Sequence, residues 1–343
     1  MKYEAYMQRC IELAQNGAGN VSPNPMVGAV VVYDDKIIGE GYHQLYGEAH
    51  AEVNAIKAVE DKSLLSEATI YVSLEPCAHF GKTPPCSNLI IESKIPNVVI
   101  GCSDPFAQVA GKGIEKLKAA GINVSMGVLE KECLELNKRF FTFHEKKRPY
   151  IILKWAQSQD GFMDKKRTDT CPTINWITRP NTKQLTHKWR SEEDAILIGK
   201  KTAINDNPEL TTRAVDGKNP TRIVIDRKLE LSKDLKIFNS ASKTIILNEL
   251  KNQENDSILH KKVDFESFFD DLWSICAEND IISLIIEGGA FTLNQFIEKE
   301  FWDEARVLTG KPFFAEGVKA PLLNLEPAEQ FTFDKDKITY YIK

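Results

Sequence analysis

The sequence predicts two consecutive α/β domains. Its 343 residues favour two hydrophobic cores over one. In each half, short apolar runs of strand length alternate with longer segments whose apolar residues recur at helical spacing. The stretch 144–149 (HEKKRP) is polar, charged and ends in proline, which is typical of a segment between domains. We therefore expect one domain over residues 1–145 and a second over 146–343.

The first half is expected to begin with a helix over residues 3–16, because apolar residues from Tyr6 to Ala14 share one helical face. Two runs, 27–33 and 36–41, flank an Asp-Asp turn and predict a hairpin. Further helices are expected at 50–59, 87–93, 113–120 and 131–141, and further strands at 68–74, 98–102 and 124–127. Because strands and helices alternate, the later part of this sheet should be mostly parallel.

The second half repeats this alternation. Strands are expected at 150–155, 195–198, 221–225, 244–247 and 283–286, and helices at 181–190, 267–277 and 291–298. Residues 338–342 alternate between apolar and polar, which indicates a late edge or antiparallel strand. The stretch 251–263 is polar, and we expect a surface loop there.

Composition excludes several functional classes. A net charge of -5 argues against a general binder of nucleic acid or of membrane surfaces. Residues 1–17 have no long apolar core and no small-residue cleavage site, and no apolar run approaches the roughly 20 residues that span a bilayer. We expect a cytoplasmic protein. The seven cysteines are odd in number, so a disulfide framework is not expected, and most cysteines should be core residues.

The sharpest motif joins His50-Ala51-Glu52 to Pro76-Cys77 and to Cys86. Catalytic zinc uses three nitrogen or sulfur ligands and leaves a fourth position for water. His50, Cys77 and Cys86 supply such a set, and Glu52 is placed to carry a proton from water to a leaving amine. The histidine opens one predicted helix and Cys86 opens another, so two helix N-termini would face one metal. A lone HAE or two lone cysteines would be weak evidence, but their combination predicts a zinc deaminase.

The loop between the cysteines carries a family resemblance. Many deaminases have two residues there, whereas this chain has eight (AHFGKTPP). The longer loop resembles the deaminase domain of the bifunctional riboflavin biosynthesis deaminase/reductases, as do residues 22–28 (SPNPMVG) and 41–43 (GYH). The resemblance implies a cytidine-deaminase-like α/β/α sandwich. It also implies substrate binding by Asn24, His43, His79 and Lys82. Met26 departs from the family, which often has arginine there.

Three of these four substrate contacts have a plainer alternative. Asn24 can read a base edge through its amide, but between two prolines it can equally be a turn residue. His43 can be a surface strand histidine, and His79 a loop residue without a ligand. Lys82 can meet a phosphate as a point charge.

The second half has no G-x-G-x-x-G fingerprint, so a simple dinucleotide fold is not expected. Its most informative turn is Glu287-Gly288-Gly289-Ala290, which follows an apolar strand and precedes a helix. Paired glycines allow a ligand to approach the backbone, and free N–H groups at a helix start bind phosphates. A strand–Gly-Gly–helix turn is also common without any ligand.

Longer strings in this half resemble the reductase domain of the same family. They are residues 154–161 (KWAQSQDG), 176–178 (WIT) and 199–213 (GKKTAINDNPELTTR). The resemblance implies a dihydrofolate-reductase-like α/β domain. It implies NADPH contacts at Ala156, Trp176, Thr202, Asp206 and the stretch from Gly289. It implies substrate contacts at Ile174, Arg190, Leu210, Arg213 and Glu287.

The residue types support part of this assignment. Arginines such as Arg190 and Arg213 bind phosphate through two parallel hydrogen bonds, although each can also be a solvated surface charge. Lys154 lies inside an apolar strand, which indicates a role near the hydride or the phosphate; we expect it and Asp206 to act in the reduction. Asp206 can instead begin a turn before Asn207-Pro208. Gln159 and the polar stretch 165–172 depart from the family.

The sequence as a whole is identified as a member of the bifunctional family. This implies zinc-dependent deamination of a phosphorylated ribosylaminopyrimidine, followed by NADPH-dependent reduction of its ribosyl group to ribityl. It also implies a homo-oligomer acting on a small molecule. One rival is a nucleoside or tRNA deaminase with a non-catalytic C-terminal domain, which the long cysteine loop and the acidic charge disfavour. Another is a sensor or scaffold that only binds ligands, which the intact zinc-and-glutamate motif disfavours.

Overall fold

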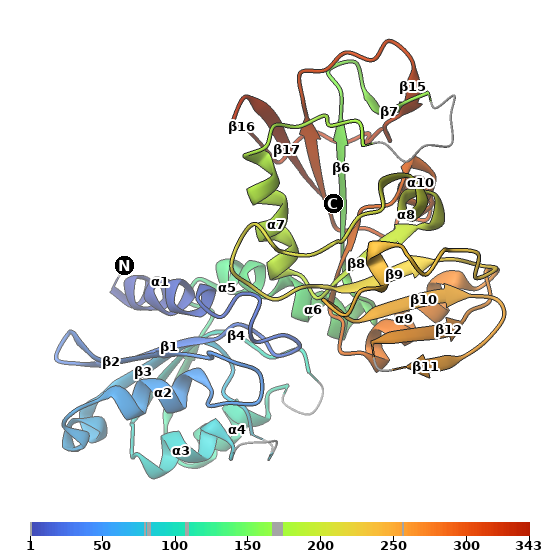
Figure 1. The fold of residues 1–343 in the computed structure, drawn as a ribbon. Coiled ribbons are helices and arrows are strands. Elements are labelled where there is room, and N and C mark those ends of the chain that lie inside the picture. The colour runs from blue at the N-terminus through green and yellow to red at the C-terminus, as the bar shows by residue number, and fades with distance from the viewer. Residues whose placement is uncertain (1, 79, 81–83, 107–109, 167–173, 256) are drawn as a thin grey trace. The chain divides into compact units, whose positions relative to one another are not determined.

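The computed structural model describes residues 2–78, 80, 84–106, 110–166, 174–255 and 257–343 (Figure 1). It divides into two compact units, Met1–Lys147 and Arg148–Lys343. Helix α6 (Lys138–Lys146) extends into the stretch expected to be a linker, so only residues 147–149 of that stretch are non-helical. The buried side chain of Phe140 explains why this charged segment folds as a helix.

The first unit is built on one five-stranded sheet. Its strands, in spatial order, are β2 (Lys36–Tyr42), β1 (Gly28–Tyr33), β3 (Thr69–Leu74), β4 (Asn97–Cys102) and β5 (Asn123–Met126). The predicted hairpin is confirmed, since β1 and β2 pair antiparallel. β1 also pairs antiparallel with β3, whereas β3, β4 and β5 are parallel. The carboxyl ends of β3 and β4 therefore lie at the same edge of the sheet.

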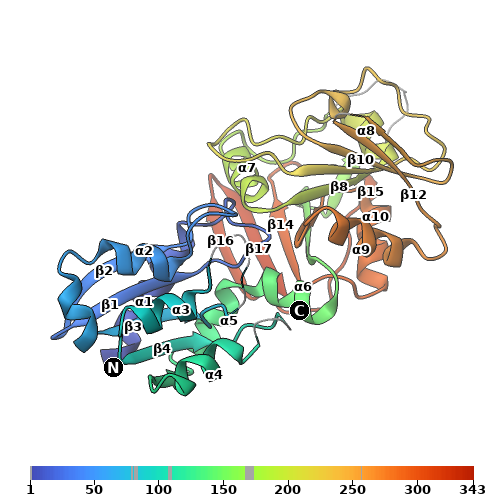
Figure 2. The same ribbon diagram turned by 90° about the horizontal axis from the view of Figure 1, so that it is seen from below.

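Helices cover both faces of this sheet (Figures 1 and 2). They are α1 (Lys2–Gln15), α2 (Ala51–Ala58), the 3-10 helix η1 (Lys62–Glu67), α3 (Cys86–Glu92), α4 (Lys112–Ala119), α5 (Glu130–Leu136) and α6. One apolar core joins α2, α3 and α4 to one face, through residues such as Ile56, Ile90 and Leu117. The other joins α1 and α5 to the opposite face, through Met7 and Cys133. The expected α/β/α sandwich is confirmed.

The prediction of a single helix over residues 131–141 is wrong. The structure has two helices, α5 and α6, separated at Asn137. The Asn137 side chain is buried and binds the backbone of Met26, accepting from its N–H at 2.8 Å and donating to its carbonyl at 2.8 Å. An asparagine occupied in this way competes with continued helix, which the local apolar pattern does not reveal.

The second unit is built on a ten-stranded sheet. Its strands, in spatial order, are β11 (Gln253–Asn255), β12 (Ile258–Lys262), β10 (Thr244–Asn248), β9 (Thr221–Ile225), β8 (Ala195–Gly199), β13 (Ser283–Ile286), β6 (Tyr150–Gln157), β14 (Glu304–Thr309), β17 (Asp336–Ile342) and β16 (Glu329–Phe333). From β12 to β14 every pair is parallel, and the outer pairs on both sides are antiparallel. A separate two-stranded ribbon joins β7 (Phe162–Lys165) to β15 (Gly317–Lys319).

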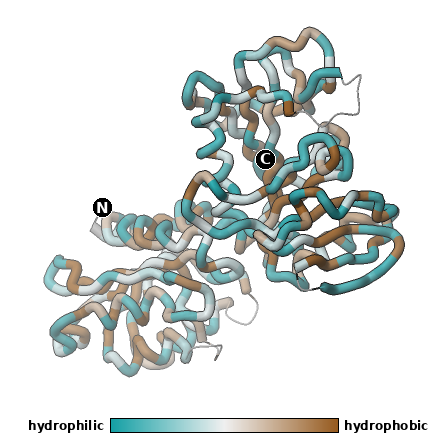
Figure 3. Tube along the Cα trace, in the orientation of Figure 1, coloured by the Kyte–Doolittle hydropathy of each residue, from teal (hydrophilic) through white to brown (hydrophobic). Residues whose placement is uncertain are grey.

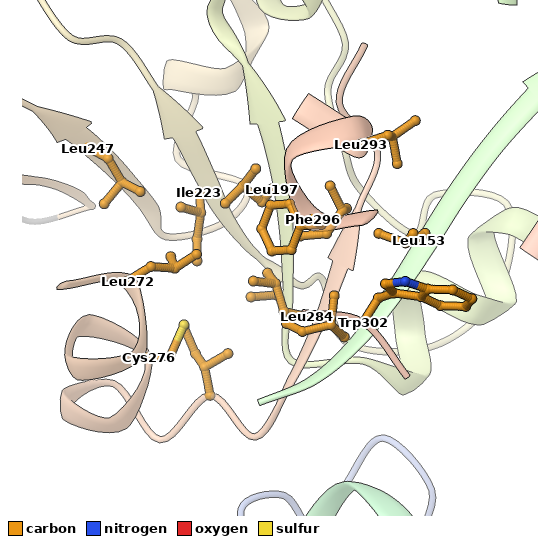
Figure 4. Packing of buried hydrophobic residues seen from close by; sticks show 14 of the residues in the cluster. Leu153, Leu197, Ile223, Leu247, Leu272, Cys276, Leu284, Leu293, Phe296 and Trp302 are labelled. Atoms are coloured by element: carbon orange, nitrogen blue, oxygen red, sulfur yellow. The ribbon is translucent and has the colours of Figure 1, made fainter. Parts of the chain in front are cut away.

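Helices again cover both faces of this sheet. They are α7 (Thr182–Glu192), α8 (Lys200–Asp206), the 3-10 helix η2 (Lys236–Phe238), α9 (Phe268–Glu278) and α10 (Ala290–Glu298). Figure 4 shows the larger core, in which Leu272 and Cys276 of α9 and Phe296 of α10 pack on strand residues such as Leu197 and Leu284. The other face carries η2 and α8 over a second apolar cluster. In Figure 3 the apolar residues concentrate along the strands. The expected α/β architecture is confirmed.

The prediction of a surface loop over residues 251–263 is also wrong, because the strands β11 and β12 occupy most of this stretch. β12 adds to the sheet by parallel pairing with β10 and turns Leu259 into the core. Its last three residues, 260–262, are polar and lie near the rim of the sheet, which hides the strand pattern. Within the described residues, no helix is both long and apolar enough to cross a membrane.

Candidate functional site

Three predicted metal ligands meet in the first unit, each at the end of an element. His50 is the N-cap of α2, Cys77 follows β3, and Cys86 is the first residue of α3. Their ligand atoms all lie within 4.8 Å of one another. The His50 Nδ1 atom faces both sulfurs, at 3.6 Å from Cys77 Sγ and 3.3 Å from Cys86 Sγ. The nitrogen turned to the cluster is thus Nδ1, which the sequence did not specify.

This spacing fits zinc. Tetrahedral zinc with Zn–S of about 2.3 Å and Zn–N of about 2.0–2.1 Å places nitrogen and sulfur ligands about 3.6 Å apart. The hydrogen bond from the Cys86 thiol, together with His50, lowers the pKa of Cys77 to about 4. The backbone N–H of Cys86 also donates to Cys77 Sγ at 3.3 Å. One thiolate is therefore available without the metal, and the donor set is a soft N, S, S triad with room for a fourth ligand.

Glu52 lies beside the triad, in the first turn of α2, and is 3 % exposed. Its pKa is raised to about 7, mainly by burial and also by the negative charge of Cys77. The charge of His50 acts in the opposite direction. A carboxyl group in such a setting can both take up and release a proton near neutral pH.

Asn24 and His43 are hydrogen-bonded to each other in the same unit. His43 Nδ1 lies 3.1 Å from the Ala49 carbonyl, which can only accept, so Nδ1 carries the proton. Burial lowers the pKa of His43 and favours the neutral ring, whose Nε2 is then an acceptor. The Asn24 amide donates to that Nε2 at 3.2 Å. Its carbonyl oxygen can accept from a ligand N–H.

The rings of His43 and His50 lie 5.3 Å apart, so this pair is next to the metal ligands. The alternative of a surface histidine does not describe His43, which is 2 % exposed. Asn24 is a turn residue, since its N–H donates to the Val21 carbonyl at 2.9 Å, and its side chain also binds His43. His79 and Lys82, also predicted to bind substrate, lie outside the described residues. The backbone of Met26 is fixed by Asn137 as described above.

In the second unit, Lys154, Arg190 and Glu287 form one buried ion cluster. Lys154 is on β6, Arg190 on α7, and Glu287 directly follows β13. The Arg190 guanidinium donates from Nε to Glu287 Oε1 at 3.1 Å and from Nη2 to Oε2 at 2.8 Å. Lys154 Nζ lies 3.5 Å from Glu287 Oε1. All three side chains are at most 14 % exposed.

The cluster carries two positive charges and one negative charge. Although burial opposes it, attraction to Arg190 and Lys154 lowers the pKa of Glu287 to about 2. The pKa of Lys154 is lowered, mainly by burial and also by repulsion from Arg190, whereas attraction to Glu287 raises it. Glu287 is thus ionised, and Lys154 is a more acidic ammonium than an exposed lysine. The surplus positive charge suits an anionic ligand.

The carboxyl ends of β8 and β13, which are neighbouring parallel strands, each carry a glycine turn into a helix. A Cβ at Gly288 would lie 2.6 Å from the Cβ of Thr292, so the turn requires glycine. Gly289 caps α10 without any side-chain hydrogen bond, and a Cβ there would lie 3.6 Å from Thr202 Oγ1. The structure therefore brings together Thr202 and Gly289 at the sheet edge where α/β folds bind nucleotides.

The other predicted contacts of this unit are more scattered. Ala156 is on β6, two residues after Lys154, and Asp206 is the last residue of α8. Ile174 and Trp176 are exposed, and the Lys183 ammonium lies 3.4 Å from the centre of the Trp176 ring.

Leu210 and Arg213 differ in what they can offer a ligand. Leu210 has its side chain in the core, so only its backbone can contact a ligand. Arg213 donates to Thr211 Oγ1 at 3.3 Å. Gln159 is an exposed residue of the turn after β6, and residues 167–173 lie outside the described part of the chain.

Two further residues at these sites were not predicted. His187 of α7 is 4 % exposed, and burial, then Arg190 and Arg213, lower its pKa to about 4. Glu75 is a buried acid directly before Pro76-Cys77. The sequence signal for Glu75 is an acidic residue directly after an apolar strand. His187 lies on a polar helical segment and has no such signal.

Comparison with known proteins relates both units to described families. Residues 1–102 match the model of the cytidine and deoxycytidylate deaminase zinc-binding region, and residues 149–333 match the RibD C-terminal domain. Riboflavin biosynthesis protein RibD of Aquifex aeolicus is 39% identical over 331 residues, covering 95% of this chain and 91% of the relative. That of Bacillus amyloliquefaciens is 40% identical, covering 93% and 87%.

Solved structures agree over the full length. The diaminohydroxyphosphoribosylaminopyrimidine deaminase/5-amino-6-(5-phosphoribosylamino)uracil reductase of Thermotoga maritima superposes with a TM-score of 0.88 at 36% identity, covering 99% of this chain and 98% of the other. RibD of Acinetobacter baumannii has a TM-score of 0.89 at 28% identity, with the same coverage.

Proposed function

The chain belongs to the RibD family of bifunctional riboflavin biosynthesis enzymes, with a zinc-dependent deaminase unit and an NADPH-dependent reductase unit, and from this we propose which residues perform each reaction. The substrate that we propose is a diaminopyrimidinone carrying a 5'-phosphoribosylamino group, as the name of the Thermotoga relative indicates. The observation that carries the deaminase assignment is the N, S, S triad beside a buried glutamate.

We propose that His50, Cys77 and Cys86 hold the zinc. Zinc held in this way would supply a water that is acidic enough to attack near neutral pH. Glu52 takes a proton from that water and delivers it to the amine nitrogen of the substrate. The water oxygen bonds to the ring carbon, the bond from that carbon to the amine breaks, and ammonia leaves; the second proton of the water ends on the adjacent ring nitrogen as the new carbonyl group forms. Asn24, held by His43, accepts from an N–H of the pyrimidine and orients the ring. His79 and Lys82 remain predicted substrate contacts.

For the reductase unit we propose that Gly289, Thr202, Ala156, Trp176 and Asp206 hold NADPH. NADPH bound there would supply a hydride. Its acceptor is the ribosyl C1', whose bond to the ring oxygen opens to give the ribityl chain. That oxygen requires a proton, and the Lys154 ammonium is the acid that the cluster offers. Glu287 holds Lys154 in place and accepts from substrate hydroxyls. Arg190 and Arg213, with Ile174 and the Leu210 backbone, complete the substrate site.

We propose further that the chain acts on small molecules and not on nucleic acid, which its net charge of -5 supports. A homo-oligomer is proposed from the family resemblance alone. None of the described cysteines forms a disulfide, which supports a reducing compartment and thus the cytoplasm.

Removal of the metal tests the division of labour. Dialysis against a zinc chelator should abolish ammonia release from the diamino substrate, and added Zn²⁺ should restore it. NADPH oxidation with the already deaminated substrate should be unchanged, because the described residues of the second unit contain no cluster of metal ligands. Loss of both activities, or of neither, would contradict the assignment of zinc to the first unit alone.

A further inference from the structure

Glu75 is the buried acid at the end of the strand that carries the metal ligand Cys77. Its side chain is 3 % exposed. The carboxylate accepts four backbone N–H groups, from Asp104 at 3.3 Å and Gly111 at 3.1 Å on Oε2, and from Gly113 at 3.0 Å and Ile114 at 3.3 Å on Oε1. All four donors lie in the connection between β4 and α4 or in the first turn of α4.

The same connection also touches the backbone next to the ligand. A Cβ on Gly113 would lie 2.0 Å from the Pro76 carbonyl oxygen, so the start of α4 packs directly on the residue between Glu75 and Cys77. The Glu75 N–H donates to the Cys102 carbonyl at 3.0 Å, which extends the β3–β4 pairing by one residue. Glu75 and Pro76 are therefore fixed on both sides of their backbone.

Cys77 itself is held from the opposite direction. The Cys86 N–H donates to Cys77 Sγ at 3.3 Å, and the Ser87 N–H donates to the Cys77 carbonyl at 3.1 Å. The start of α3 thus fixes Cys77 on one side, and the Glu75 contacts fix the preceding residues on the other. Without the Glu75 contacts, Cys77 would still be attached to α3 but could shift relative to the end of β3.

We propose that Glu75 is a positioning residue for the deaminase metal centre, acting through its four backbone hydrogen bonds on the placement of Cys77. The proposal rests on the zinc site proposed above. Its role differs from that of a simple helix cap, because one of its donors, Asp104, lies eight residues before α4. Groups that orient metal ligands typically change metal affinity or activity by about 10–100-fold when they are replaced.

The test is Glu75→Gln. A glutamine side chain has the same shape but offers only one oxygen, and its NH₂ group would face two of the four N–H donors. The zinc-loaded variant should lose zinc to a chromogenic chelator about 10–100-fold faster than the wild type. The visible absorption of the Co²⁺-substituted protein should also change, because the cobalt bands report ligand geometry. NADPH oxidation with deaminated substrate should be unchanged.

The matched control is Asp61→Asn. Asp61 accepts from the Ser63 N–H at 3.0 Å and caps η1 in the same unit, so its loss should leave zinc release and the cobalt spectrum unchanged. Wild-type zinc release and an unchanged cobalt spectrum in folded Glu75→Gln would overturn the proposal.

If thermal melts show that the Gln variant does not fold, Glu75→Asp decides, because it keeps the charge but is shorter by one methylene. It should release zinc faster than the wild type, and a wild-type rate would overturn the proposal. A wild-type protein that binds no zinc would instead overturn the metal site itself.

Discussion

Replacing Glu52 by glutamine is expected to lower the rate of ammonia release by about 10²–10⁴-fold, which is the typical contribution of a general acid–base group. Glu52 is the buried acid beside His50, Cys77 and Cys86, and glutamine keeps its shape while removing the carboxylate that takes up and releases the proton. Zinc content should stay at the wild-type level, because Glu52 is not one of the three ligands. The measurement is kcat for ammonia release, with zinc determined on the same sample.

The control for this variant is Glu60→Gln, an exposed glutamate just after α2 in the same unit. It should have wild-type activity. Reduction of the deaminated substrate by NADPH should be unaffected in both variants. If Glu52→Gln retained wild-type deamination, the proton would have to travel through another group, and the assignment of Glu52 would be wrong.

Replacing Lys154 by methionine is expected to lower kcat for NADPH oxidation by about 10²–10⁴-fold, again the range for loss of an acid group. Methionine preserves most of the volume of the buried stem. Glu287 keeps its two hydrogen bonds from Arg190, so no unpaired charge is left buried. Folding and NADPH binding should therefore persist, and the loss should fall on kcat more than on KM for NADPH.

Lys188→Met is the matched control for this experiment. Lys188 is on α7, is 62 % exposed and pairs with Glu192 on the same helix, so its removal should not change reduction. Ammonia release should be normal in both variants. An equal loss in Lys188→Met, or wild-type kcat in Lys154→Met, would contradict the proposed role of Lys154.

The deaminase motif could be predicted from sequence because its parts are local. His50 and Glu52 are two residues apart. Cys77 follows a strand and Cys86 begins a helix, and both elements can be predicted from the apolar pattern. The same holds for the glycine turn after β13. Lys154 was noticed because a charge interrupts an apolar strand, but its partners Arg190 and Glu287 were assigned by resemblance, and their common cluster appears only in the fold.

What the sequence did not reveal depends on contacts between distant segments. Asn137 divides two helices by binding Met26, 111 positions away, and Glu75 binds Gly113, 38 positions away. Neither pairing leaves a periodic signal. The strand β12 leaves no clear pattern for a related reason, since its last three residues are polar near the rim of the sheet and its partner β10 lies elsewhere in the chain.

The central claim is that one chain performs both reactions, and a coupled assay on the purified, zinc-loaded protein tests it most directly. The diamino substrate is supplied first and ammonia is measured, then NADPH is added and its absorbance is followed. The account predicts ammonia release without NADPH, followed by oxidation of about one NADPH per ammonia released. Ammonia release with no NADPH consumption, or NADPH consumption with no ammonia from the zinc-loaded protein, would contradict it.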